Sequence, residues 1–188
     1  MNDTDLLIGE TSRVVLAVPG PDAAPSVVRY LQRNSEHFAP WNPPAPEGLY
    51  TEAYWRQRLA AALEEVRQGT QLRLMLLSRA EPSHPVVGDI GFTAIVRGPF
   101  QACYLGYRLD HELVGQGVMY EALKTAIGYV FGELKLHRIM ANYMPHNVRS
   151  ARLLRRLGFV PEGYARDYLF LAGAWQDHVL TSLTNPAV

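Results

Sequence analysis

Two glycines one residue apart open the stretch VGQGVMYEAL, from Val114 to Leu123. It follows a strand-like run, Ala102 to Leu109, and leads into apolar residues at helical spacing: Met119, Leu123, Ile127 and Val130. A tight loop between a strand and a helix directs unpaired backbone N–H groups and the positive end of the helix macrodipole at one point. These residues therefore indicate an anion site, and phosphate is its most common occupant.

Two familiar phosphate motifs do not fit this stretch. A P-loop requires GxxxxGK[ST], and the lysine and hydroxyl residues are missing. A dinucleotide fingerprint requires a third glycine three residues after the second, where this chain has Tyr120. The remaining interpretation is a short G-x-G loop that binds the pyrophosphate of coenzyme A. The loop alone does not distinguish that role from an ordinary turn.

A second segment, NVRSARLLRRLGF from Asn147 to Phe159, decides between them. With the glycine loop it resembles the GCN5-related N-acetyltransferase (GNAT) family, whose second cofactor segment reads N-x-x-S, a leucine-rich helix and L-G-F. The matching residues are Asn147, Ser150, Leu153, Leu154, Leu157, Gly158 and Phe159.

The resemblance is densest to family members that acetylate the N-terminal alanine of a small-subunit ribosomal protein. It continues in QACYLGY (101–107), HRIMANYMPHN (137–147), LGFVPEGYARDYL (157–169) and WQDHVLTSL (175–183). It is looser in the first half, where TSRVVL and HFAPWNP still fit. It implies an α/β (α+β) fold with a mixed, mostly antiparallel sheet of about seven strands, splayed between the fourth and fifth and flanked by about four helices. We expect one domain over residues 1–188, with residues 1–10 as a flexible arm.

Composition narrows the partners. Lys and Arg total 18, as do Asp and Glu, so the formal net charge is zero and direct nucleic-acid binding is not expected. Cys103 is the single cysteine, and no His/Cys cluster has metal-ligand spacing, so neither a disulfide nor a metal is expected. The N-terminus lacks a signal-peptide core and no apolar run is of membrane length, which favours a cytoplasmic protein. Monomer and homodimer remain open.

The resemblance implies acetyl-coenzyme A as co-substrate in the splayed cleft. Main-chain groups of Arg108 and Leu109 would pair with the pantetheine arm like an added strand. Asn147 would contact the pantetheine, and Ser150 would lie near the thioester sulfur. From the residues alone, both also fit ordinary helix N-capping. Backbone amides would bind the pyrophosphate along the run Val114, Gly115, Gln116, Gly117, Val118 and Met119.

Direct attack of an amine on the thioester needs an acid for the departing thiolate. Ser150 and Tyr143 are the candidates, although a tyrosine in a strand is more often a core residue. No residue is assigned as base, and an acyl-cysteine on Cys103 is disfavoured because no base accompanies it. Asp177 and His178 are expected to form a structural pair. Phe38, Trp41 and Tyr168 are expected to wall a slot for a small N-terminal residue.

Arg149, Arg152 and Arg156 recur at helical spacing opposite a leucine face. They fit either a solvated helix face or, for one of them, a contact with the 3′-phosphate of coenzyme A. The leading hypothesis is a protein N-terminal alanine acetyltransferase. One alternative keeps the chemistry with a small amine or antibiotic as acceptor, which acidic residues in the acceptor cleft would favour. Another is a non-catalytic acyl-coenzyme A sensor or ribosome assembly factor.

Overall fold

The computed structural model describes residues 5 to 187, which form an eight-stranded sheet in the order β1-β2-β3-β4-β5-β6-β8-β7. The strands are β1 (Leu6–Glu10), β2 (Val14–Val18), β3 (Leu72–Ser78), β4 (Val86–Val96), β5 (Ala102–Leu109), β6 (Arg138–Met140), β7 (Val160–Leu171) and β8 (Ala174–Thr184). The helices are α1 (Ala24–Arg33), α2 (Ser35–Phe38), α3 (Glu52–Arg67), α4 (Val118–Gly132) and α5 (Val148–Arg156), with short 3-10 turns η1 (Pro21–Ala23), η2 (Ala39–Trp41) and η3 (His111–Leu113).

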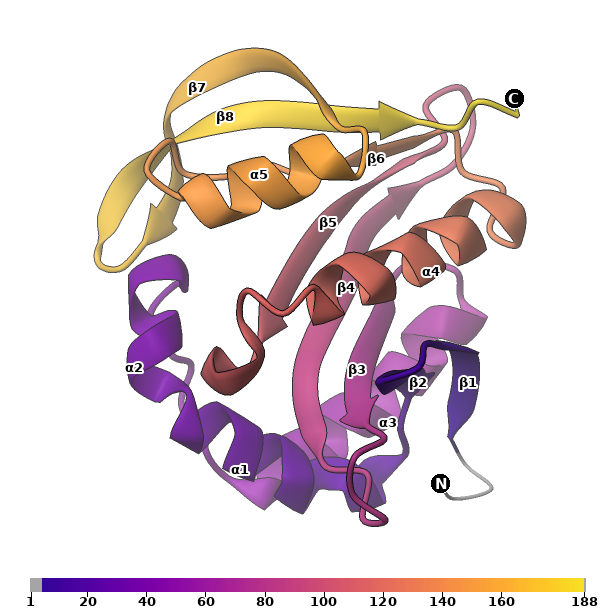
Figure 1. Ribbon diagram of the computed structural model, residues 1–188, viewed down its shortest axis with the longest axis vertical. Helices are drawn as coiled ribbons and strands as arrows, with labels where there is room; N and C mark the ends of the chain where they lie inside the picture. Colours follow the sequence, from indigo (N-terminus) through magenta and orange to yellow (C-terminus); the bar gives the residue numbers. More distant parts are fainter. Residues whose placement is uncertain (1–4, 188) are drawn as a thin grey trace.

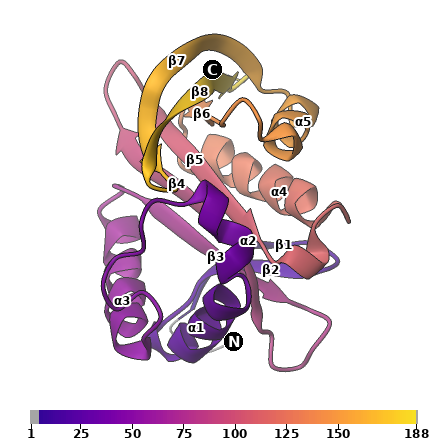
Figure 2. The same ribbon diagram turned by 90° about the vertical axis from the view of Figure 1, so that its left-hand side faces the viewer.

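Helices cover both faces of the sheet, as Figure 2 shows, with α1, α2 and α3 on one side and α4 and α5 on the other. Successive side chains of a strand point to opposite faces of the sheet, so the hydrophobic core has two parts, one on each face. In β3, Leu74 and Leu76 join the cluster that contains Leu123 of α4. Met75 between them joins the cluster around Tyr30 of α1. No described helix is long and apolar enough to cross a membrane.

The expected flexible arm is wrong for residues 6–10. This segment is β1, the edge strand, antiparallel to β2 with Leu6 opposite Val18 and Glu10 opposite Val15. It was missed because one partner strand and the adjacent α4 order it, and neither is visible in five residues of local sequence. Residues 1–4 of the predicted arm lie outside the described residues. With β1 and the short α2 added, the sheet has eight strands and the described chain five α-helices.

β5 and β6 are the parallel pair of the described sheet, and they part early (Figure 1). Residues 102–104 of β5 pair with residues 138–140 of β6. Further on, the N–H of Tyr143 donates to the carbonyl of Val179 in β8 (3.2 Å). Residues 105–109 of β5 are therefore left without a partner on this side, which confirms the splay predicted between the fourth and fifth strands of the expected sheet.

The end of β5 is tied to α1 by buried polar groups. The Arg33 guanidinium contacts the Asp110 carboxylate, whose side chain is 4% exposed, and also donates to the carbonyl of Val86 (2.8 Å). Asn34, fully buried, accepts from the backbone N–H of His111 (2.9 Å). Burial alone would raise the pKa of Asp110, but hydrogen bonds from Arg33, Asn34 and the backbone N–H of Glu112 outweigh it and lower the pKa below its ordinary value of 3.8.

Replacing Asp110 with Asn should lower the free energy of unfolding by about 2 kcal/mol at neutral pH, because Arg33 loses a charged partner. Since the folded pKa of Asp110 lies below the unfolded one, this stabilisation is present above the unfolded value and is lost as pH falls through the folded value. Urea unfolding of both proteins, from neutral pH down past 3.8, should show the difference shrinking. A difference that stays constant over this range would contradict the assignment.

Candidate active site

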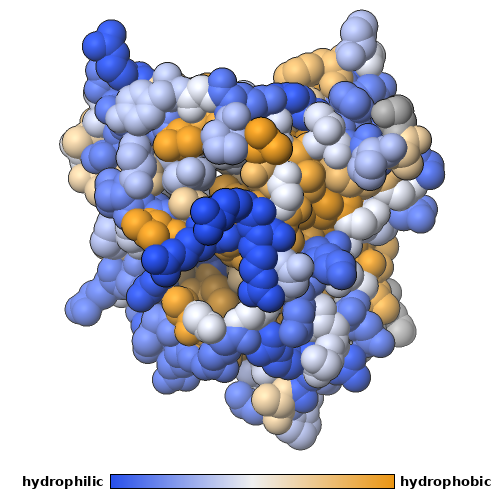
Figure 3. All heavy atoms as spheres, turned by 45° about the horizontal axis from the view of Figure 1, so that its top comes forward, coloured by the Kyte–Doolittle hydropathy of each residue, from blue (hydrophilic) through white to orange (hydrophobic). Residues whose placement is uncertain are grey.

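Two cavities meet where β5 and β6 part. One, of about 410 Å3, lies against α4 and α5; the other, of about 540 Å3, is lined by β3, β4, β5 and the β7–β8 hairpin. Figure 3 shows a hollow at the centre of one face, with hydrophobic atoms at its base and hydrophilic side chains reaching across it. We call the cavity of about 410 Å3 the cofactor cavity and the cavity of about 540 Å3 the acceptor cavity. The residues that line both are Trp41, Asn42, Tyr107, Arg108, Asn147 and Ser150.

The glycine loop forms the end of the cofactor cavity. Gly115 and Gly117 both have left-handed backbone, with φ of +84° and +80°, and Gly117 is the N-cap of α4. Side chains are strained in this region, so glycine is required by conformation. Among the described residues, the N–H groups of Gly115, Gly117 and residues 118–120 at the start of α4 have no hydrogen-bond acceptor, and the first helical bond runs from the Glu121 N–H to the Gly117 carbonyl (3.2 Å). This is the donor set of an anion site at a helix N-terminus.

Two N–H groups of the predicted amide run differ from the expectation, because they form hydrogen bonds within the loop. The N–H of Val114 donates to His111 (3.3 Å) and that of Gln116 to Leu113 (3.4 Å), so both are engaged within the loop. The Gln116 side chain donates to the carbonyl of Glu112 (2.6 Å), and neither Gln116 nor Val118 lines the cavity. The Val118 side chain is buried in the core, 2% exposed, but its backbone N–H belongs to the open first turn of α4. Local turn hydrogen bonds, which the glycine spacing does not specify, account for the difference.

Arg13, at the start of β2, holds the glycine loop from beneath, and sequence reasoning missed it. Its Nη1 donates to the carbonyl of Gln116 (2.7 Å), while Nη2 and Nε donate to the Glu121 carboxylate (2.8 and 3.3 Å). The guanidinium thus joins the loop to the first turn of α4 by a bidentate contact. Because the carbonyl of Gln116 accepts from Arg13, Arg13 constrains the peptide plane between Gln116 and Gly117.

The structure confirms the capping interpretation of Asn147, while the contacts of Asn147 and Ser150 with the cofactor stay predictions. The Asn147 side chain accepts from the Ser150 backbone N–H (3.1 Å) and so caps α5. Both residues also line the two cavities. Capping fixes the start of α5 and leaves the Ser150 hydroxyl beside the passage between the cavities.

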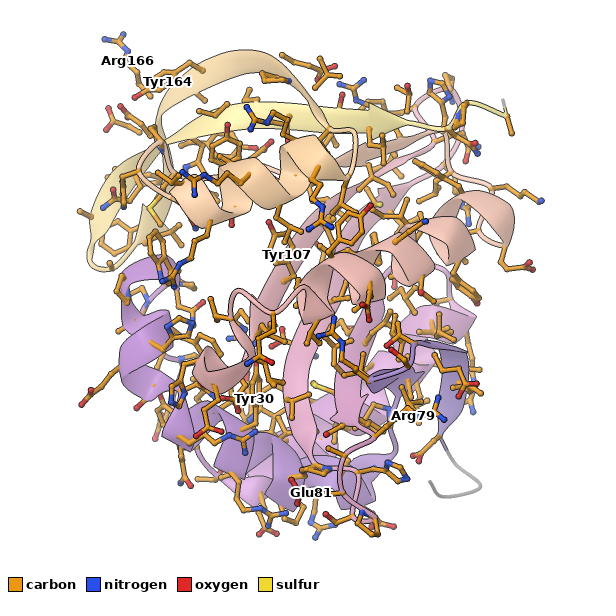
Figure 4. All side chains as sticks on the ribbon, viewed as in Figure 1. Tyr30, Arg79, Glu81, Tyr107, Tyr164 and Arg166 are labelled. Atoms are coloured by element: carbon orange, nitrogen blue, oxygen red, sulfur yellow. The ribbon has the colours of Figure 1, made fainter. Side chains whose placement is uncertain are left out.

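Tyr107 is a second residue that sequence reasoning missed. It lies between α5 and α4 (Figure 4) and lines both cavities, and its buried hydroxyl has no hydrogen-bond partner of ordinary geometry among the described residues. Burial raises the pKa of Tyr107 to about 12, which the neighbouring Ser150 offsets only in part. The phenol is therefore protonated at neutral pH and available as a donor. Its sequence signal was only its place before Arg108 in the strand assigned to pantetheine.

Arginines of α5 give the cofactor cavity a positive rim. Arg149, Arg152 and Arg156 all line it, so they are not simply a solvated helix face. The Arg156 guanidinium lies 4.0 Å from the centroid of the Tyr120 ring on α4, a cation–π contact across the cavity. This arrangement suits a polyanionic ligand.

Arg108 separates the acceptor side from α1. It donates to Asp89 through Nε and Nη2 (3.0 and 3.1 Å), and the Tyr30 hydroxyl donates to the same carboxylate (3.0 Å). Burial works against the charge on Arg108, but Asp89 outweighs it and raises the pKa. The Phe38 ring lies under this guanidinium (5.4 Å) and is 5% exposed. Phe38 and Leu109 line the cofactor cavity and not the acceptor cavity, so the structure does not bring Phe38 together with Tyr168 in one wall.

Trp41, Tyr143 and Tyr168 do line the acceptor cavity. Asn142 donates to the Tyr168 hydroxyl (3.1 Å), and the Tyr168 ring packs on His178 (5.3 Å between centroids). The expected pair of Asp177 and His178 is wrong, because successive strand residues point to opposite faces. Asp177 accepts from the Tyr164 hydroxyl (2.6 Å), whereas the Nδ1 of His178 bonds to the carbonyl of Gln176 (3.0 Å).

Cys103 is fully buried in the core, and burial raises the pKa of its thiol to about 12. A protonated, inaccessible thiol is a poor nucleophile, consistent with direct transfer. Among the described residues, no group of three or more His, Cys, Asp or Glu side chains could hold a metal ion.

The sheet is splayed at its parallel strand pair, and an anion-binding loop lies at the opening. This arrangement is typical of a group transferase whose two substrates meet in the gap between the strands. Residues 13–160 match the family model described as acetyltransferase (GNAT) domain, and the chain belongs to that family of N-acetyltransferases.

Similar proteins agree over nearly the whole chain. The [ribosomal protein uS5]-alanine N-acetyltransferase of Escherichia coli is 43% identical over 94% of this chain and 90% of its own length. A crystal structure of ribosomal-protein-S5-alanine acetyltransferase from Vibrio fischeri has a TM-score of 0.90 at 35% identity, covering 98% of each chain. Mycobacterium smegmatis RimJ in complex with CoA-disulfide shares the fold, with a TM-score of 0.83 at 23% identity over 97% of this chain and 91% of that one.

Replacing Arg13 with Ala should raise the KM for acetyl-coenzyme A about tenfold, the equivalent of roughly one charged hydrogen bond. The loop would lose the contact that orients its peptide planes. The matched control is Arg79→Ala, which removes an arginine of similar exposure from the neighbouring β3 edge, where it bonds to Glu10 (3.1 Å).

The same variants should be assayed with S-acetyl-N-acetylcysteamine, a thioester without a pyrophosphate. We expect Arg13→Ala to match the wild type on this substrate, because the loop has no phosphate to bind. Equal losses on both thioesters would point to general destabilisation and contradict a role through the loop.

Proposed function

We propose that this protein transfers the acetyl group of acetyl-coenzyme A to the N-terminal α-amino group of a protein, with the N-terminal alanine of ribosomal protein uS5 as its acceptor. The observation that carries the proposal is the meeting of the cofactor and acceptor cavities at Tyr107 and Ser150, in a chain 43% identical to an enzyme named for that reaction. Both cavities are built on one continuous sheet, which supports action as a single domain.

The residues present fit acetyl-coenzyme A. The free amides of Gly115, Gly117 and the first turn of α4 suit the pyrophosphate, and the arginines of α5 suit the 3′-phosphate. The unpaired edge of β5, residues 105–109, offers main-chain groups to the amides of the pantetheine arm. The thioester would then reach the passage shared by both cavities.

The acceptor cavity favours a peptide end over a polycationic small molecule. Asp89 is the single carboxylate among the described residues that line this cavity, and Arg108 and Tyr30 already engage it. No free acidic group is left there to attract several ammonium groups. The walls are instead formed by aromatic side chains, Trp41, Tyr104 and Tyr168, together with the guanidinium groups of Arg73 and Arg108, which repel ammonium groups.

The reaction does not require a strong base to deprotonate the acceptor amine. An α-amino group has an unperturbed pKa of about 7.7–8.0, so much of it is neutral at working pH. The amine attacks the thioester carbon, the carbon–sulfur bond breaks, and the thiolate leaves, while the nitrogen that becomes the amide releases one proton to solvent. Tyr107 donates a hydrogen bond to the departing sulfur, with Ser150 beside it. Full proton transfer from a phenol with a pKa of about 12 to a thiolate, whose ordinary pKa is near 8.5, is uphill, so stabilisation by hydrogen bonding is its role.

The direct test of function is intact mass spectrometry of purified uS5 incubated with this protein and acetyl-coenzyme A, alongside a panel of uS5 N-terminal peptides that differ only in the first residue. We expect a single acetyl group on the α-amine, with alanine preferred. Equal acetylation of peptides with every first residue would contradict the hypothesis of a size-selective slot. Binding of acetyl-coenzyme A without turnover on any amine would instead favour a sensor.

Replacing Tyr107 with Phe should lower kcat with acetyl-coenzyme A by about 100-fold, the low end for losing a hydrogen-bond donor to charge that develops in the transition state. Phe keeps the ring and removes a hydroxyl that has no partner, so thermal stability should not fall. An aryl thioester, whose leaving group needs no such help, should recover most of the rate. Ser150→Ala serves as the comparison: unchanged turnover there would remove Ser150 from the mechanism.

A further inference from the structure

The acceptor cavity has two glycines side by side on its sheet wall. Gly91 of β4 and Gly106 of β5 are directly opposite in the antiparallel register, and both line the cavity. Arg73 of β3 continues the same row on the other side of Gly91. We call Gly91 and Gly106 the glycine floor. No other row of these three strands presents two residues without side chains to this cavity.

Neither backbone conformation nor packing explains the glycine floor. Both glycines lie in regular strand, and neither is among the residues with positive φ. A Cβ at Gly106 would have no described heavy atom within 4 Å, and one at Gly91 would make only ordinary contact with Thr93 (3.8 Å). Gly88 is different, because a Cβ there would lie 2.8 Å from Leu76 and 2.9 Å from the Arg108 carbonyl.

Glycine inside a strand is costly, because it adds conformational entropy to the unfolded chain and packs no side chain. Where packing does not require it, a strand glycine commonly marks the close approach of a ligand or another backbone. Gly106 is exposed, and the space above it is the acceptor cavity itself. The two glycines therefore leave open the space in which an acceptor would lie.

We propose that the glycine floor receives the N-terminal residue of the acceptor protein, and that Gly106 sets the limit on the size of its side chain. This inference rests on the proposed function. Gly106 directly precedes Tyr107, so a residue lying on Gly106 is next to the passage through which the thioester is reached.

The groups around the floor specify the chemistry of that first residue. On one side stands Tyr104, 40% exposed, and on the other the ion pair of Arg108 and Asp89. The ion pair is internally neutralised, and Arg73, beside Gly91, is paired with Glu65 (3.6 Å). Tyr168 also lines the cavity. The floor therefore suits a small, uncharged side chain on an extended backbone, and rejects bulk by direct contact.

The test compares Gly106→Ala and Gly106→Val with wild type on two peptides that begin with Gly or Ala and are otherwise identical. Gly163→Ala is the matched control: it is a strand glycine outside both cavities, where a Cβ would make ordinary contact with Leu180 (3.9 Å). For each protein, kcat/KM is measured on both peptides, and the Kd of acetyl-coenzyme A is measured by calorimetry.

We expect Gly106→Ala to lower kcat/KM about tenfold or more on the Ala peptide and much less on the Gly peptide, within the range of about 10–200-fold for one methylene in a tight pocket. Gly106→Val should extend the loss to both peptides. The Kd of acetyl-coenzyme A and all values for Gly163→Ala should match wild type.

Equal losses of Gly106→Ala on both peptides, or a weaker acetyl-coenzyme A affinity that accounts for the loss, would overturn the size limit while leaving the proposed function intact. A wild-type protein that binds acetyl-coenzyme A and acetylates neither these peptides nor uS5 would overturn the proposed function, and this inference with it.

Discussion

The site depends on one interruption of backbone pairing. β5 and β6 share hydrogen bonds only over residues 102–104 and 138–140, after which β6 continues toward β8 and leaves the edge of β5 open. Unpaired main-chain groups inside a protein cost free energy unless something else bonds to them. The opening is therefore a place where the fold itself lacks a strand, and an extended ligand with amide groups can supply what is missing.

Polar contacts between distant parts of the chain hold the rim of this opening. Arg13 reaches from β2 to the glycine loop, Arg33 from α1 to Asp110 at the end of β5, and Arg108 from β5 to Asp89 of β4. Each guanidinium meets a carboxylate with at least one further hydrogen bond nearby, which is the geometry in which a partly buried ion pair is worth its desolvation. The loops around the opening are thus tied to the sheet by side chains from distant parts of the chain.

The sequence predicted the features that are local. Gly115 and Gly117 specify a left-handed loop, and Asn147 with Ser150 specifies a helix start, because each depends on residues a few positions away. Splaying followed from the family resemblance. Other features were not predicted, namely Arg13, Tyr107 and the pairing of Gly91 with Gly106. Their roles depend on partners far along the chain, which only the folded sheet brings together. β1 was not predicted for the same reason.

The two cavities open on different sides of the sheet and share only six residues. The α4 and α5 side holds the phosphate donors, while the other side is walled by the segment after α2 and by the β7–β8 hairpin, where the N–H of Ala172 bonds to the carbonyl of Asn42 (2.9 Å). Substitutions in the β7–β8 hairpin, at residues such as Tyr168 and Leu169 that line the acceptor cavity alone, can change which amine is accepted without disturbing how the donor is held. Divergence of substrate range within such a scaffold is thereby decoupled from its cofactor chemistry, and the two can evolve at different rates.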